Sequence, residues 1–295
     1  MRADLYDVLL DEITSAVTFS PDQPDEGPES TLKALWHAAA GNPRSARTAT
    51  QHELENLTDA QAEVLRHMLA ERRSGRPLMQ ITGRAHFMGL ELEFAPDVFV
   101  VRPETEILGR SAIEFLQTRE KPILVDVGCG SGNLTCGISH ALAGLRVHAI
   151  DVLESCVQLT TRNAARCGVA DRVLVARGDL FSPLEGRNLE QSLDAVICNP
   201  PYIASSRLKG DRAYLVAYEP REAFDGGPFG FAMQQRLIKE SLRFLKPGGG
   251  LLFEFGAGQH GQVQGLIRRA GGYARIDLKT DEAGVARVVV AQKAD

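Results

Sequence analysis

Four consecutive residues, Asn199-Pro200-Pro201-Tyr202, combine two hydrogen-bond acceptors with a backbone that has little freedom. A residue that precedes proline is driven toward extended geometry, so Asn199 has few backbone conformations. Proline has no N–H, so the Pro200 carbonyl has no competing donor beside it. That carbonyl and the Asn199 side-chain oxygen can together accept both hydrogens of one –NH2 group, at about 3 Å. The pattern predicts catalytic roles for Asn199, Pro200 and Tyr202.

Such a pair of acceptors suits methyl transfer to a planar, conjugated nitrogen. The lone pair of an amide, a guanidine or an aryl amine is delocalised and must be turned toward the methyl group. As the nitrogen attacks, its hydrogens become more acidic and their bonds to the acceptors strengthen, which stabilises the transition state more than the ground state. The face of Tyr202 can cover the planar group or stabilise its positive charge. Alone, the tetrapeptide could equally be a simple turn.

A glycine-rich turn, Asp126-Val-Gly-Cys-Gly-Ser-Gly132, follows an apolar run and predicts a nucleoside site. Its glycines permit a tight turn and a close approach of backbone to ligand. A dinucleotide site would continue Gly-x-Gly-x-x-Gly, but residue 133 is asparagine. Asp151 lies 19 residues beyond Gly132; it can accept from both ribose hydroxyls or cap a helix. Asp179 can accept from an adenine amino group, and Leu180 or Phe181 can cover the ring.

Together these sites predict S-adenosylmethionine as cofactor and S-adenosylhomocysteine as product, with no metal. The expected cofactor-binding residues are Asp126, Gly128, Cys129, Gly130, Ser131, Gly132, Asp151, Asp179, Leu180 and Asn199.

Alternating strand and helix patterns must position these residues. Apolar runs predict strands at 123–127, 146–150, 172–176, 193–198 and 251–255, with two more at 274–278 and 286–291. Helices are expected between the first five of these strands, notably at 153–167 and 231–245. This alternation predicts an α/β, Rossmann-like doubly wound sheet, whose binding residues follow the carboxyl ends of the strands.

The preceding residues predict a separate helical region. Helices are expected at 2–17, from a cap at Ser30 or Thr31 to Gly41, and after Thr58. Thr50 to Glu53 and Thr58 to Gln61 both match the capping box. A β-hairpin is expected over 84–101, turning at Ala95-Pro96-Asp97, and then a short helix at 104–117. The predicted domains are therefore 1–80 (helical), 81–103 (hairpin linker) and 104–295 (methyltransferase).

Composition narrows the function classes. The chain has 295 residues, a net charge of −5 and 44% hydrophobic residues, so it can bury a sizeable core. Nothing indicates the basic surface by which proteins neutralise a phosphate backbone. The five cysteines form no Cys-x-x-Cys pair, which argues against a disulfide framework or zinc site. No apolar run is long enough to span a membrane, and we expect a cytoplasmic protein.

With these residues in view, the chain resembles the HemK-type protein-glutamine N5-methyltransferases, which methylate the Gly-Gly-Gln glutamine of peptide-chain release factors. The resemblance covers about 30–290. Besides the glycine loop and Asn199 to Ile203, the matching segments are Arg72-Arg73-Ser-Gly75-x-Pro77, Ile81-Thr-Gly83, Phe87-Met-Gly89, Arg102-Pro-Glu104-Thr-Glu106, Tyr218-Glu-Pro220, and Asp281-x-Ala-Gly284 with Arg287.

The resemblance implies a class I methyltransferase sheet with an antiparallel last strand, and a helical N-terminal domain that helps to dock a release-factor-like protein. It implies that Gly128 to Gly132, Asp151 and Leu180 contact the cofactor, and that Asn199 to Tyr202 hold the target amide. The substrate-binding residues that we expect are Arg102, Glu104, Pro201, Tyr202 and Glu219.

Three departures from the family pattern bear on the substrate. Val101 replaces a usual proline, Leu180 stands where an aromatic is common, and residues 227–231 read Gly-Pro-Phe-Gly-Phe rather than continuing Asp-Gly-Leu. One alternative is a small amino-acid-like substrate, such as the guanidino group of free arginine, because Glu104, Glu106 and Glu219 could favour a cation. These acids could equally serve in salt bridges and helix caps. Amino methylation of nucleic acid, and a non-catalytic cofactor-binding protein, are the remaining alternatives.

Overall fold

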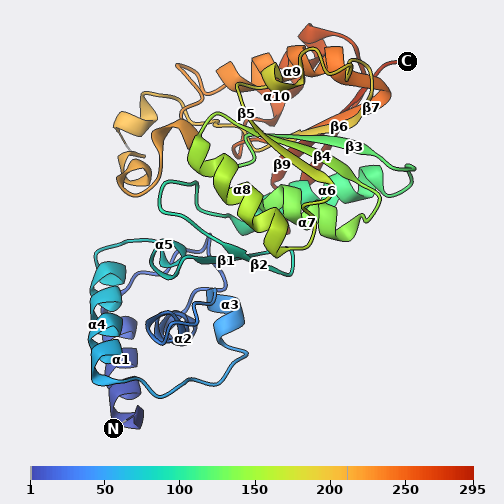
Figure 1. Ribbon diagram of the computed structural model, residues 1–295. Helices are drawn as coiled ribbons and strands as arrows, with labels where there is room; N and C mark the ends of the chain where they lie inside the picture. The colour runs from blue at the N-terminus through green and yellow to red at the C-terminus, as the bar shows by residue number, and fades with distance from the viewer. Residues whose placement is uncertain (1, 211) are drawn as a thin grey trace. The chain divides into compact units, whose positions relative to one another are not determined.

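The computed structural model describes residues 2–210 and 212–295. The chain forms two compact units (Figure 1). The first comprises the residues up to Pro96 together with Val100–Pro103, and the second comprises Asp97–Phe99 and Glu104–Asp295. Among the described residues, no helix is both long enough and apolar enough to cross a membrane.

The first unit is built mainly of helices around a small apolar core. Its helices are α1 (Arg2–Ala16), α2 (Pro28–Ala39), α3 (Ala46–Ala49), α4 (Asp59–Arg73) and α5 (Leu78–Thr82). Leu9, Leu35 and Trp36 are buried in this core, and the Trp36 indole donates to the Glu55 carbonyl at 2.8 Å. The indole N–H is thus satisfied where burial would otherwise make it costly.

The helix boundaries test the cap predictions. The capping box of Thr58 and Gln61 is confirmed at the start of α4. The one expected at Thr50 is wrong, because Thr50 ends α3 and no helix starts there. The helix α2 also begins earlier than expected. Gly27 is its N-cap and Pro28 its first residue, so Ser30 is the third helical position, from which its hydroxyl accepts from the Gly27 N–H.

The predicted hairpin exists, but its predicted turn is wrong. Strands β1 (Arg84–Phe87) and β2 (Leu90–Glu93) pair antiparallel, and the turn is at Met88 and Gly89. Both turn residues have positive φ, 48° and 83°, as a tight hairpin turn requires. Residues 98–101 form no strand. Both strands lie within the first compact unit.

In the second unit, seven strands of the described chain form one sheet in the order β5-β4-β3-β6-β7-β9-β8. The strands are β3 (Ile123–Val127), β4 (Arg146–Asp151), β5 (Val173–Arg177), β6 (Leu193–Cys198), β7 (Leu245–Glu254), β8 (Tyr273–Thr280) and β9 (Ala286–Lys293). The first five are parallel, while β9 pairs antiparallel with both β7 and β8. The predicted doubly wound sheet with an antiparallel last strand is confirmed.

Helices cover both faces of this sheet (Figure 1). One face carries α6 (Glu106–Leu116), α7 (Asn133–Ala141) and α8 (Glu154–Arg166), and the other carries α9 (Ala232–Phe244) and α10 (His260–Ala270). Short 3-10 turns lie at Pro103–Thr105, Ser182–Leu184, Arg207–Lys209, Ala213–Ala217 and Arg221–Ala223. The chain changes direction along the sheet between β3 and β6, which are neighbours, and ligands of open α/β sheets bind at such a point.

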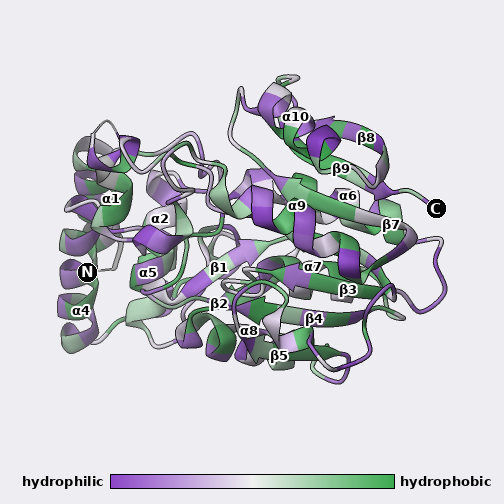
Figure 2. Ribbon diagram, turned by 90° about the horizontal axis from the view of Figure 1, so that it is seen from above, coloured by the Kyte–Doolittle hydropathy of each residue, from purple (hydrophilic) through white to green (hydrophobic). Residues whose placement is uncertain are grey.

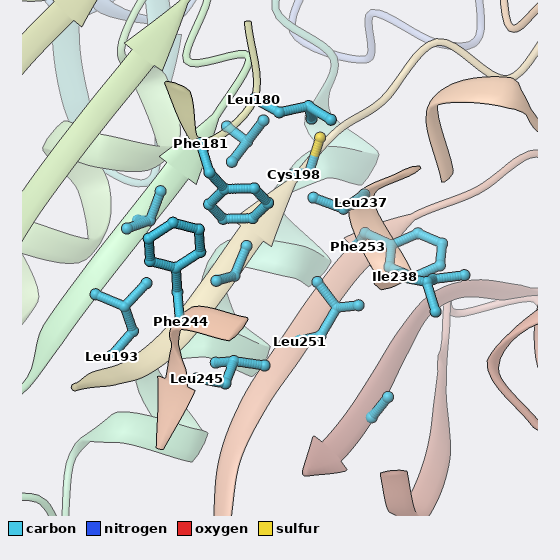
Figure 3. Packing of buried hydrophobic residues seen from close by; sticks show 14 of the residues in the cluster. Leu180, Phe181, Leu193, Cys198, Leu237, Ile238, Phe244, Leu245, Leu251 and Phe253 are labelled. Carbon is cyan, nitrogen blue, oxygen red and sulfur yellow. The ribbon is translucent and has the colours of Figure 1, made fainter. Parts of the chain in front are cut away.

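The core of the second unit lies between the sheet and its helices. Strand β6 is buried along its whole length, as expected for a central parallel strand, and the strands are mostly apolar (Figure 2). Phe181 and Phe244 stack with ring centroids 5.1 Å apart. Leu180, Phe253 and Cys198 belong to the same cluster (Figure 3). This packing fixes the strands whose ends carry the candidate site.

Candidate active site

Strand register brings the two predicted motifs together. Val127 pairs with Cys198 across β3 and β6, and with Ile150 across β3 and β4. The glycine loop, Asp151 and Asn199 therefore all leave the sheet at the same edge, from three adjacent parallel strands.

The glycine loop is a pre-formed backbone cradle. The N–H groups of Gly128 and Cys129 both donate to the Ile150 carbonyl, at 2.8 and 3.0 Å. Gly128 and Gly130 have positive φ, and a Cβ on either would meet nothing within 4 Å. Gly132 differs, because a Cβ there would lie 2.9 Å from the Thr160 side chain of α8. Two glycines thus leave open space for a ligand, and the third allows close helix packing.

Asp126 carries an unsatisfied oxygen beneath this cradle. Its side chain is fully buried. One carboxylate oxygen, Oδ2, accepts from the Thr135 hydroxyl at 2.6 Å. The other, Oδ1, has no hydrogen-bond partner within the described residues. Burial raises the pKa of this carboxyl to about 7, and the Thr135 hydrogen bond opposes the rise. Such an orphaned acceptor fits an incoming cationic or N–H-bearing ligand group, since an unpaired buried carboxylate is costly.

The Asp151 carboxylate accepts hydrogen bonds from two backbone N–H groups. Its Oδ1 accepts from the Leu153 N–H at 3.0 Å, as in a turn that leads into a helix, and its Oδ2 accepts from the Gly130 N–H at 2.9 Å. The second bond ties the carboxylate to the glycine loop. Each carboxylate oxygen keeps acceptor capacity, so the residue fits a ribose diol while it orders the loop.

The two remaining cofactor candidates, Asp179 and Leu180, differ in exposure. The Asp179 side chain is exposed and accepts hydrogen bonds from both terminal nitrogens of Arg236 on α9, at 2.9 and 3.2 Å. Leu180 is 1% exposed and packs in the core (Figure 3), with φ at +50°. A leucine with a left-handed backbone conformation is uncommon and strained. Its backbone is therefore held in place by packing.

The Asn199 side chain is held by a hydroxyl that the sequence did not single out. Its Nδ2 donates to Thr105 Oγ1 at 3.2 Å, and that hydroxyl donates to Glu254 Oε2 at 2.8 Å. In the described part of the chain, neither Asn199 Oδ1 nor the Pro200 carbonyl accepts a hydrogen bond. Both predicted acceptors thus remain available to a substrate.

Tyr202 is fixed through its backbone. Its carbonyl accepts from Gln259 Nε2 at 3.0 Å, and its ring lies beside Gly256, where a Cβ would be 3.1 Å from Tyr202 Cδ2. A Cβ on Gly230 would lie 2.6 Å from the Tyr202 carbonyl oxygen. Tyr202 can therefore occupy this position because residues 230 and 256 are glycines without a Cβ.

The expected substrate-binding residues are only partly brought together. Glu104 lies in the 3-10 turn just before α6, and its charge helps to raise the pKa of Arg287, after the larger effect of Asp281. Glu219 is 9% exposed and Pro201 is half-buried.

Arg102 belongs to the first unit. There burial raises the pKa of Glu26, and the charges of Arg72 and Arg102 oppose the rise.

Thr105 and Glu254 are the residues that sequence reasoning missed at this site. Thr105 lies within the motif from Arg102 to Glu106, and Glu254 lies within the strand predicted at 251–255. Their contacts span 94 and 149 residues of sequence, which no local pattern reveals. No cluster of three or more His, Cys, Asp or Glu arranged for a metal ion occurs among the described residues.

The sheet order and the glycine loop define a class I methyltransferase. The family model "Methyltransferase small domain" matches residues 104–215. The solved catalytic domain of hMettl16, in complex with the MAT2A 3′UTR hairpin 6, has a similar fold, with a TM-score of 0.55, 14% identity, and 82% of this chain and 84% of that chain covered. This chain is an S-adenosylmethionine-dependent methyltransferase, and the cradle above Asp126 fits that cofactor.

Two similar proteins show which family this chain belongs to. The chain is 35% identical to the release factor glutamine methyltransferase of Moorella thermoacetica over 239 residues, which are 81% of this chain and 83% of the relative. It is 36% identical to that of Gloeobacter violaceus over 214 residues, 72% and 73% of the two chains. The chain belongs to the release factor glutamine methyltransferase family.

Proposed function

We propose that this enzyme transfers a methyl group to the side-chain amide nitrogen of a glutamine in a peptide-chain release factor. The observation that carries the proposal is the pair of unpaired acceptors, Asn199 Oδ1 and the Pro200 carbonyl, beside the glycine loop. The names of the relatives support a release factor as the acceptor.

The two acceptors would bind both hydrogens of the glutamine amide and turn its lone pair toward the methyl group. Bound S-adenosylmethionine would supply an electrophilic methyl group on a sulfonium. As the nitrogen–methyl bond forms, the sulfur–methyl bond breaks and S-adenosylhomocysteine leaves, and the nitrogen then loses one hydrogen to solvent as a proton. As the amide nitrogen gains positive charge, its hydrogen bonds to Asn199 and Pro200 become charge-assisted, each contributing about 1.5–3 kcal/mol. Both acceptors are fixed beforehand, so little reorganisation is needed during the reaction. The Tyr202 face would cover the planar amide.

For the cofactor, we propose that Gly128 to Gly132, with Cys129 and Ser131, form the backbone cradle. Asp126 would bind a cationic or N–H-bearing group and Asp151 the ribose. Asp179 would first have to share its carboxylate with Arg236 if it is to bind the adenine amino group. Leu180 would contribute through its backbone and the edge of its side chain, because the side chain is buried in the core.

The alternative of a guanidino substrate receives less support from the geometry. Glu104, one of the acids that motivated it, is close enough to Arg287 to raise that residue's pKa. Its charge is therefore partly balanced already. The net charge of −5 likewise gives no support for a nucleic-acid substrate. The five cysteines, all within the described residues, are free, which supports the cytoplasmic location that we propose.

The test offers labelled S-adenosylmethionine with a release factor, free arginine or RNA in parallel. We expect label on the release factor, at the amide nitrogen of one glutamine. Asn199→Ala should lower kcat by about 100-fold or more, because it removes one of the two acceptors. The matched control is Asn42→Ala in the first unit, whose side chain binds Glu55 on the surface. Label on arginine or RNA alone would refute the proposal.

A further inference from the structure

We propose that Thr105 and Glu254 are positioning residues, which hold the Asn199 amide in one orientation so that its oxygen faces the target nitrogen. The inference rests on the proposed function, in which Asn199 Oδ1 is an acceptor for the substrate. It assigns a role to two buried polar side chains that lie outside the glycine loop and outside the segment from Asn199 to Tyr202.

Strand register places Asn199 beside Glu254, and hydrogen bonds bring Thr105 to both. Cys198 pairs with Phe253 across β6 and β7, so Asn199 and Glu254 follow at the same level of the sheet. Thr105 comes from the start of α6. Thr105 and Glu254 are only 2% and 3% exposed. The hydrogen bonds of 3.2 and 2.8 Å thus lie largely out of solvent, where they are stronger than in water.

The direction of these hydrogen bonds determines which end of the Asn199 amide points to the substrate. A carboxylate can only accept, so the single hydroxyl hydrogen of Thr105 is donated to Glu254. The hydroxyl oxygen then presents only lone pairs to Asn199, and of the two ends of the amide only Nδ2 can donate to it. A flipped amide would place Oδ1 against those lone pairs and lose the bond. The charge of Glu254 therefore fixes Oδ1 toward the open side.

Helix capping does not explain the Thr105 hydroxyl. Thr105 occupies the N-cap position of α6, yet its side chain makes no capping hydrogen bond. Threonine is favoured at N-caps because its oxygen accepts from the first turn of the helix. Here that oxygen accepts from Asn199 instead. Thr105 ends a 3-10 turn and has helical φ and ψ of −63° and −18°, a geometry in which its hydroxyl does not cap α6. The hydroxyl bonds Asn199 and Glu254.

The backbone of Asn199 is restricted as well. It lies between Cys198, the last residue of β6, and Pro200, which limits its conformations. With the backbone held by the sheet and the proline, the side-chain amide flip is the main remaining freedom. The chain of hydrogen bonds from Glu254 removes it, so the acceptor is set before the substrate binds.

The test compares two substitutions at Thr105. Thr105→Val keeps the shape and removes the hydroxyl, and Thr105→Ser keeps the hydroxyl. We expect Thr105→Val to lower kcat about tenfold, equivalent to the loss of one hydrogen bond of about 1.4 kcal/mol. The Kd for S-adenosylmethionine should stay within about twofold, and Thr105→Ser should stay within about threefold of wild-type kcat.

Glu254→Gln is the second variant. A neutral amide can present either its oxygen or its nitrogen to Thr105, so the direction of the hydrogen-bond chain is no longer fixed. We expect an intermediate loss of kcat, again without a change in cofactor affinity. Thermal melting of every variant separates this effect from a loss of folded protein.

Nuclear magnetic resonance of the Asn199 side chain supplies a readout that needs no substrate. The Nδ2 resonance is assigned by its absence in Asn199→Ala. Its hydrogens should exchange slowly in wild type and Thr105→Ser, and faster in Thr105→Val. Equal exchange in all three, or wild-type kcat in Thr105→Val, would overturn the positioning role. If no acceptor is methylated, the proposed function fails, while the exchange rates still decide the orientation.

Discussion

At the scale of single residues, Asp126 is the group whose ionisation should control cofactor binding. Its pKa is raised to about 7, chiefly by burial. A ligand group that is cationic or carries N–H donors favours the ionised carboxylate. Cofactor binding below pH 7 should therefore release a proton, and affinity should fall by up to about tenfold per pH unit between pH 7 and 5.5. Calorimetry in buffers of different ionisation enthalpy measures both effects.

The isosteric variant Asp126→Asn is the control for this titration. It should bind the cofactor more weakly at pH 8, and its affinity should change little between pH 5.5 and 7. A wild-type affinity that is constant over that window would contradict the role given to Asp126. The other acid of the loop, Asp151, already accepts two backbone N–H groups, so it offers no comparable orphaned oxygen.

The same raised pKa affects stability without cofactor. Between about pH 4 and 7 the unfolded carboxyl is ionised while the folded one still holds its proton. In this window the folded state binds more protons than the unfolded state. The free energy of unfolding therefore falls as pH rises, and the contribution of Asp126 to stability is fully lost above about pH 7. Asp126→Asn should flatten this part of the pH–stability curve, which denaturant unfolding at several pH values measures. A curve of unchanged slope would show that Asp126 does not titrate in this range.

At the scale of elements, the segment 226–230 packs against the segment from Asn199 to Tyr202. Gly230 has φ +79°, and a Cβ there would lie 2.6 Å from the Tyr202 carbonyl oxygen. That oxygen is held by Gln259, so it has little room to move. Gly230→Ala should therefore displace Tyr202 and lower kcat about tenfold or more, because small misplacements at a reacting centre are costly. Steady-state kinetics with the methyl acceptor measure the loss.

The control separates this contact from backbone strain. Gly186 has a similar φ of +72°, but a Cβ there meets nothing within 4 Å. Gly186→Ala should cost about 1 kcal/mol of stability and leave kcat unchanged. Equal kinetic effects of the two substitutions would show that the approach to Tyr202 does not matter.

Element boundaries show which physical signals the sequence carries. β3 and β6 are found where predicted, at 123–127 and 193–198, because central parallel strands are nearly continuous apolar runs, here interrupted by one aspartate each. The hairpin turn was misplaced because Ala95-Pro96-Asp97 looks like a stronger turn than Met88-Gly89, where a methionine must adopt positive φ. The helix α10 was not predicted, since Gly261 and Gly265 weaken its pattern.

The candidate site was predictable where a motif is continuous in sequence. The acceptors at Asn199 and Pro200 and the open glycines could be inferred from the residues that flank them. The orientation of the Asn199 amide could not, since it depends on Thr105 and Glu254, which the fold brings from distant segments. The pairing of Asp179 with Arg236 was missed for the same reason.

At the scale of the whole molecule, the two compact units contain separate apolar cores. The core around Trp36 draws only on the first unit, and the core around Phe181 and Phe253 only on the second. All the proposed catalytic and cofactor-binding residues lie in the second. A fragment of residues 97–295 should therefore fold with a cooperative melting transition and bind S-adenosylmethionine within about threefold of the full chain.

The same fragment tests the substrate-docking role that we propose for the first unit. If that unit helps to hold a protein substrate, its removal should raise KM for the release factor about tenfold or more, a loss of roughly 1.4 kcal/mol. The matched comparison is a short glutamine-containing peptide, for which kcat/KM should be nearly equal in fragment and full chain. An unchanged KM for the whole release factor would show that docking lies within the second unit. A fragment that neither melts cooperatively nor binds cofactor would show that the second core depends on the first.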